Sequence, residues 1–127
     1  MHATDINEAA LECTRYNGEL NGATARLRAA APWELPRSMG ASVAMANMLP
    51  GPLIGEAVEI AARLQHGALL LITGFRSPDL AAVRAAFEAH FDLPEQPTTS
   101  RAGWLMLACR RRKDDVNLVA LSSSAVE

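Results

Sequence analysis

Two short apolar runs flank a segment whose apolar residues recur at helical spacing. The first run is residues 41–47 (ASVAMAN) and the second is residues 68–73 (ALLLIT). Apolar runs of this length, bounded by turn signals, are typical of buried strands. The residues between them repeat every three or four positions, like the buried stripe of a helix: Leu53, Ile54, Ala57, Val58, Ala61 and Leu64. This part of the chain therefore predicts a strand, a helix and a second strand in succession.

Turn-forming residues set the expected ends of these elements. Pro50 and Pro52 break the chain after the first strand, and His66-Gly67 is predicted to end the helix. Gly74 is predicted to end the second strand.

Further strands and helices are expected on both sides of this unit. We predict short strands at residues 1–5 and 24–28, with a helix from Glu8 to about Leu20 between them. The later elements are a helix capped by Ser77, with Leu80, Val83, Phe87 and Phe91 on one face, and a last strand over residues 103–109. This alternation favours an α/β fold with a mostly parallel sheet.

Size and charge exclude several classes of function. A chain of 127 residues is expected to form one domain. The net charge of −2 provides no electrostatic basis for direct binding of nucleic acid. No apolar run approaches the roughly 20 residues of a membrane span, so no membrane association is expected.

The cysteines and histidines give no sign of a disulfide or a metal site. Cys13 and Cys109 lie far apart without a CxxC pattern, which indicates buried, reduced thiols in a cytoplasmic protein. His2, His66 and His90 show no ligand spacing, so we expect no metal.

Three candidate site positions fall at the predicted carboxyl ends of strands, where open α/β sheets bind ligands. They are Asp5, Asn47 and Gly74-Phe75. Each also has a plain structural reading: Asp5 can serve as an acid at a helix N-terminus, and Asn47 can form a side-chain turn before Pro50.

Two other features are read structurally. Trp104 is expected to pack in the core or on the sheet face. Arg110 to Lys113 is read as a solvated strand end, with an RNA contact as the alternative.

Residues 1–112 resemble the C-terminal portion of a class I S-adenosylmethionine-dependent methyltransferase, most closely the ribosomal protein L11 methyltransferase group. Four segments carry the resemblance in order: ATDINEAALECTRYNGELNG, AMANMLPGPLIGEAVEIAARLQHGALLLITGF, SPDLAAVRAAFEAHFDL and AGWLMLACRRR. The resemblance implies a three-layer, Rossmann-like α/β sandwich over residues 1–112. Residues 113–127 form a polar tail outside it.

The resemblance also implies roles for individual residues. Asp5 matches the acid that binds the ribose hydroxyls of S-adenosylmethionine, and Ile6 matches a residue that packs on the adenine. Asn47 matches a residue beside both the cofactor and the acceptor amine, and Leu49 and Pro50 continue that catalytic loop. The implied activity is methylation of lysine or N-terminal amines on a protein, with ribosomal protein L11 as the substrate that the resemblance implies.

One part of the family pattern is not found. The family's glycine-rich turn and first strand would precede Asp5, and we expect both to be missing from this chain. Residues 116–125 (VNLVALSSSA) are a candidate strand for that gap. The alternative function is therefore a non-catalytic remnant, or one half of a split methyltransferase that associates with itself or a partner through unpaired strands.

Overall fold

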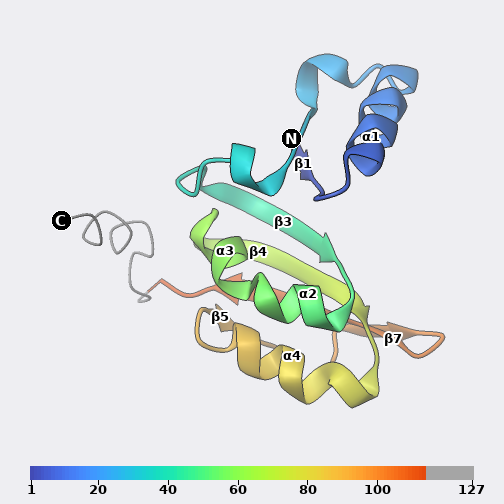
Figure 1. The fold of residues 1–127 in the computed structure, drawn as a ribbon. Coiled ribbons are helices and arrows are strands. Elements are labelled where there is room, and N and C mark those ends of the chain that lie inside the picture. The colour runs from blue at the N-terminus through green and yellow to red at the C-terminus, as the bar shows by residue number, and fades with distance from the viewer. Residues whose placement is uncertain (114–127) are drawn as a thin grey trace. The chain divides into compact units, whose positions relative to one another are not determined.

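The computed structural model describes residues 1–113 and shows an α/β chain (Figure 1). These residues fall into two compact units, of which the first runs Met1–Pro36 and the second begins at Arg37. Each unit has its own sheet and is described by itself. The tail, including the candidate strand at 116–125, lies outside the described residues. The expected α/β class is confirmed.

The first unit is a strand, a helix and a second strand, with two single-turn helices. β1 (His2–Thr4) leads into α1 (Glu8–Leu20), and β2 (Arg28–Ala30) pairs with β1 in parallel. The single-turn helices are η1 (Thr24–Arg26) and η2 (Pro32–Glu34). The helix predicted from Glu8 to Leu20 is confirmed at both ends.

Local hydrogen bonds explain where α1 begins and ends. The Asn7 side chain accepts from the Ala9 N–H at 3.0 Å, and the Asp5 carboxylate accepts from the Asn7 N–H at 2.8 Å. These bonds satisfy donors that the first helical turn leaves free. At the other end, Asn21 is the C-cap and Gly22 follows with a φ of 60°, the conformation that favours glycine after a helix.

The strand predicted at residues 24–28 is wrong. Residues 24–26 form η1, and the strand begins only at Arg28. Alternating apolar and polar residues over five positions do not determine where a strand begins. The start of β2 is determined by its parallel pairing with β1, in which His2 lies opposite Arg28 and Thr4 opposite Ala30.

The second unit contains a five-stranded mixed sheet in the order β3-β4-β7-β5, with β6 also paired to β7. The strands are β3 (Ala41–Asn47), β4 (Leu64–Phe75), β5 (Phe91–Asp92), β6 (Thr99–Arg101) and β7 (Trp104–Arg111). β3 and β4 are parallel, whereas β7 runs antiparallel to each of its partners. The predicted parallel character is therefore limited to β1–β2 and β3–β4.

Helices α2 (Pro50–Gly55), α3 (Ala57–Ala62) and α4 (Leu80–Phe87) pack on one face of this sheet, and η3 (Ser77–Asp79) leads into α4 (Figure 1). The fully buried side chains of the core come from both layers: Leu53, Ala61, Leu70, Ile72, Val83, Phe87, Phe91, Leu107 and Cys109. Unit 2 thus supplies two of the expected layers, a sheet and one layer of helices.

The segment between β3 and β4 departs from its predicted boundaries. The helix ends at Ala62, so His66-Gly67 lies inside β4 and does not terminate a helix. The pairing of β3 with β4 shifts register here, and Gly67 has a φ of 78°. A glycine with a positive φ occurs at strand irregularities of this kind as well as at the ends of helices. The residues His66-Gly67 alone therefore could not show which of the two was present. Gly74 also lies within β4, one residue before its end.

β3 is a strand as predicted, but it is not buried. It pairs only with β4 among the described strands, and Val43 and Met45 are 58% and 79% exposed. Its small apolar residues Ala44 and Ala46 pack against the core. An apolar run therefore marked an edge strand in this part of the chain.

The start of the last long helix also differs from expectation. Ser77 lies within η3, the N-cap of that turn is Arg76, and no side chain caps it. Phe91 is buried as expected but belongs to β5.

No helix among the described residues is long and apolar enough to cross a membrane.

Candidate functional site

A cavity of about 430 Å³ opens where the parallel strands β3 and β4 end. Its lining residues are Asn47, Met48, Leu49, Thr73, Gly74 and Trp104. Asn47 and Thr73 are in register across the two strands, so both strands deliver a polar side chain to the same edge of the sheet. This edge is where ligands bind in open α/β sheets.

Gly74 allows the loop after β3 to approach β4. The Met48 N–H donates to the Thr73 carbonyl at 3.2 Å. A Cβ atom at position 74 would overlap the Met48 carbonyl oxygen and would lie 2.8 Å from Met48 N. Gly74 also has a φ of 98°, which side-chain-bearing residues rarely adopt. The geometry of the cavity wall therefore requires glycine here.

The side-chain amide of Asn47 is available to a ligand. Asn47 is exposed, and its side chain makes no hydrogen bond to any residue in the range 1–113. Its neighbour Thr73, in contrast, donates its hydroxyl to the Leu105 carbonyl at 2.8 Å. The side-chain turn considered for Asn47 is not formed with the described residues, so the amide retains its donor and acceptor groups.

Leu49 and Pro50 carry the loop from the cavity into α2. Leu49 is the N-cap of α2, lines the cavity and is 68% exposed. Pro50 is the first residue of α2, where its fixed φ suits the helix and its missing N–H costs nothing. Pro50 is not among the residues that line the cavity.

Asp5 and Ile6 lie in the first unit, after β1. One Asp5 carboxylate oxygen accepts from Asn7, and the other has no hydrogen-bond partner among the described residues. Ile6 is 79% exposed. Asp5 therefore both supports the helix start and keeps an acceptor available. The ligand-binding roles of these two residues remain predictions.

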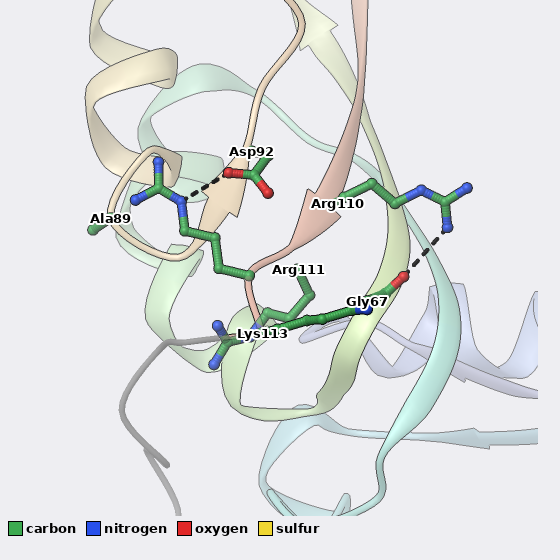
Figure 2. Close-up of a pocket in the computed structure, with 7 residues that line it drawn as sticks. Gly67, Ala89, Asp92, Arg110, Arg111 and Lys113 are labelled. Carbon is green, nitrogen blue, oxygen red and sulfur yellow. Dashed lines mark hydrogen bonds and ion pairs between the residues drawn. The ribbon is translucent and has the colours of Figure 1, made fainter.

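A second cavity, of about 770 Å³, is lined by basic residues (Figure 2). Arg112 pairs with Asp92 at 3.1 Å, and Arg110 donates weakly to the Gly67 carbonyl at 3.3 Å. Arg111 is only 4% exposed and donates to the carbonyls of Ala61 and His90. The run Arg110–Lys113 is therefore more than a solvated strand end, because one member is a buried structural arginine.

Comparison with known proteins identifies the family. The sequence profile of the family described as "Ribosomal protein L11 methyltransferase (PrmA)" matches residues 1–112. The chain belongs to the ribosomal protein L11 methyltransferase family. A "Ribosomal protein L11 methyltransferase" of Pseudomonas paraeruginosa (strain DSM 24068 / PA7) is 42% identical over 112 residues, and one of Pseudomonas aeruginosa (strain LESB58) is 41% identical.

The match to relatives in this methyltransferase family covers most of this chain but a much smaller share of each relative. In both Pseudomonas comparisons it spans 87% of this chain and 37% of the relative. The chain thus spans about a third of the length of the curated relatives it matches. A solved "Methyltransferase from Pyrococcus furiosus" superposes with a TM-score of 0.63 at 15% identity, covering 87% of this chain and 61% of that one. This likeness supports a partial Rossmann-like methyltransferase fold.

The structure adds Thr73 and Trp104 to the candidate site of this L11 methyltransferase family member, whereas Gly74 and the loop that begins at Asn47 were already expected there. Met48, Thr73, Gly74 and Trp104 line the cavity with Asn47 and Leu49. Trp104 was expected to be packed, yet it is 45% exposed. Gly103, a turn residue directly before Trp104, was the sequence signal that could have indicated this exposure, since a residue after a tight turn lies at the sheet edge.

No cluster of three or more metal-binding side chains occurs among the described residues.

Proposed function

We propose that this chain is part of an S-adenosylmethionine-dependent enzyme that methylates amino groups of ribosomal protein L11 in the cytoplasm. The observation that carries the proposal is the unpartnered Asn47 amide in a cavity at the ends of two parallel strands. Membership of the L11 methyltransferase family supplies the reaction class, because a fold alone does not specify chemistry.

Asn47 is suited to orient an amine. Its carbonyl oxygen can accept a hydrogen bond from a neutral amine, which points the nitrogen lone pair in a defined direction. S-adenosylmethionine supplies, when bound, a methyl group on a positively charged sulfur. Transfer would be an in-line displacement in which the N–C bond would form, the C–S bond would break with its bonding pair left on sulfur, and the nitrogen would then lose a proton to water. Holding the two reactants in line supplies much of the acceleration of such a step.

The remaining lining residues shape the site. Leu49 offers an apolar, exposed side chain at the mouth of the cavity. Pro50 and Gly74 hold the loop that carries Asn47. An apolar wall displaces water from the reacting amine, and a rigid loop keeps the amide in place.

Asp5 and Ile6 fit the adenosine part of the cofactor. A free carboxylate oxygen can accept from a ribose hydroxyl, and an exposed isoleucine can cover an adenine face. We propose that these two residues hold the nucleoside.

The cofactor role is tested by titrating the full chain with S-adenosylhomocysteine in a calorimeter. Asp5→Asn should weaken binding about tenfold, because it removes a charge-assisted hydrogen bond while an oxygen remains to cap Asn7. Glu8→Gln, an exposed acid on α1, is the control and should bind as the wild type does. Absence of binding at millimolar ligand would overturn the cofactor role.

The catalytic role of Asn47 is tested by transfer of labelled methyl groups to purified ribosomal protein L11. Asn47→Ala should lower kcat on the order of 100-fold if the amide positions the amine, with little effect on S-adenosylhomocysteine binding. Asn17→Ala, an exposed asparagine on α1, is the control. A variant at position 47 with wild-type kcat would reject this role.

A second candidate function is a non-catalytic chain, or half of a split enzyme, that acts through a partner. It is supported by the sheet edges of β1 and β3, which pair with β2 and β4 alone among the described strands. A monomeric preparation that transfers methyl groups unaided would rule it out.

A further inference from the structure

Arg76 is held beside the candidate site in an unusual way. Its guanidinium carbon lies 4.5 Å from the centroid of the Trp104 ring, and Trp104 lines the cavity together with Asn47. In the part of the chain that the structure describes, the Arg76 side chain forms no salt bridge and no hydrogen bond. A positive charge is therefore fixed at the rim of the cavity without a partner for its N–H groups.

The hairpin between β6 and β7 leaves room for this arginine. Gly103 precedes Trp104 and has a φ of 81°. A Cβ atom there would lie 3.2 Å from the Arg76 Nη1 atom, closer than side chains comfortably pack. The guanidinium of Arg76 therefore packs against the Trp104 indole ring and next to the Gly103 backbone, which has no side chain to block it.

Stacking on an aromatic ring leaves the edge of a guanidinium open. The ring attracts the flat face of the cation, whereas the N–H donors lie in the guanidinium plane. Those in-plane donors match the two oxygens of a carboxylate. Because stacking already limits the motion of the side chain, less conformational freedom is lost when a carboxylate binds.

We infer that Arg76, seated on Trp104, is a specificity residue that binds a carboxylate of the protein substrate next to the amine to be methylated. The inference rests on the proposed function, since it assumes that the amine enters the cavity beside Asn47. It adds a substrate property: acceptor amines with an aspartate or glutamate nearby are preferred, and amines flanked by lysine or arginine are disfavoured.

The test measures peptide binding to the full chain through the fluorescence of Trp104. Trp33, the other tryptophan, is 75% exposed in the first unit, so a Trp33→Phe background isolates the signal. The probes are hexapeptides that contain one lysine and a glutamate one, two or three residues away. Matched hexapeptides carry glutamine in place of glutamate.

The expected result is a three- to fivefold tighter binding of at least one glutamate peptide than of its glutamine match, as for a partly exposed ion pair. The preference should shrink in 0.5 M NaCl, about the level at which screening becomes strong. Arg76→Ala should abolish it, and Arg76→Glu should favour the glutamine peptide. Arg110→Ala, which removes an exposed arginine near the other end of β7, should leave the preference intact.

Three outcomes would overturn the inference. The first is an unchanged preference in Arg76→Ala, and the second is an equal loss in Arg110→Ala, which would indicate long-range charge instead of a local site. The third is that no peptide binds while S-adenosylhomocysteine does, which rejects the carboxylate site and leaves the cofactor role standing. If neither ligand binds, the proposed function fails as well. Thermal melting of each variant shows whether it is folded.

Discussion

At the scale of single residues, Gly74 determines whether the Asn47 loop can form. Gly74→Ala should destabilise the chain by roughly 2–5 kcal/mol, because it combines a disfavoured φ with a clash against the Met48 backbone. Urea unfolding measures the change. Gly55→Ala is the matched control, since a Cβ at that helical position meets nothing within 4 Å. Equal stability of Gly74→Ala and the wild type would contradict this account of the loop.

The two cysteines should differ sharply in reactivity. Cys13 is exposed, contrary to the expectation that both thiols are buried, and Cys109 is fully buried. Burial raises the pKa of the Cys109 thiol from 9.0 to about 11, against a smaller opposing effect of the Arg84 charge. A thiol reagent at pH 8 should therefore modify one cysteine in the folded chain and two in denaturant. Cys13→Ser should remove the fast reaction, and rapid labelling that persists in this variant would contradict the burial of Cys109.

The same thiol makes stability depend on pH. The unfolded chain loses the Cys109 proton near pH 9, whereas the folded chain keeps it until about pH 11. Between these values the unfolded state binds fewer protons, so the free energy of unfolding falls as pH rises, by up to about 2–3 kcal/mol. The contribution is fully present below pH 9. Unfolding curves from pH 8 to 11 measure it, and Cys109→Ala should lose this part of the slope.

At the scale of elements, the β6–β7 hairpin contains a correctable strain. Its two-residue loop is Ala102-Gly103, with φ values of 50° and 81° between the paired residues Arg101 and Trp104. Two-residue loops with two positive φ values favour asparagine followed by glycine. Ala102→Asn should therefore stabilise the chain by about 0.5–1 kcal/mol, measured by thermal melting. Ala102→Val should do the opposite, and a stabilising valine would contradict the turn geometry.

The glycines inside β4 show why the sequence predicted the presence of strands and helices better than it predicted where they end. Gly67 and Gly74 both signal a break in regular structure, and both were predicted to end an element. In the folded chain they are irregularities within one strand of 12 residues. β3 pairs with β4 before and after Gly67, at Leu64 and Leu69, and β7 pairs with β4 before and after Gly74, at Thr73 and Phe75. Local sequence does not contain this information about pairing.

At the scale of the whole molecule, the free edge of β3 is the feature most open to association. Val43 and Met45 are exposed apolar residues on a strand that pairs only with β4 among the described residues. Such edges promote pairing between chains unless charges block them. Met45→Lys should lower the apparent mass seen by light scattering at high concentration. Val58→Lys, on an exposed position of α3, is the control, and equal effects of the two changes would contradict a role for this edge.

The candidate site was only partly predictable. Asn47 and Leu49 were identified through the resemblance to the methyltransferase family, and the structure places both in one cavity. Trp104 lies on β7, more than 50 residues after Asn47 in the sequence. It lines the same cavity because β7 pairs antiparallel with β4. Gly103 marks a turn before Trp104, but no local pattern shows which distant segment the ring meets, so the contacts of Trp104 with the cavity and with Arg76 emerged only from the fold.

The sequence by itself determined the family, both ends of α1, and the succession of a strand at β3, a helical segment, a strand at β4, a helix at α4 and a strand at β7. These depend on periodicity, capping and turn residues, which act over a few neighbouring positions. The tertiary structure alone decided that β3 pairs only with β4 among the described strands, that Arg111 is buried, and that Gly74 makes room for Met48. These properties depend on which distant segments meet, and such contacts are set by packing of the complete sheet and core.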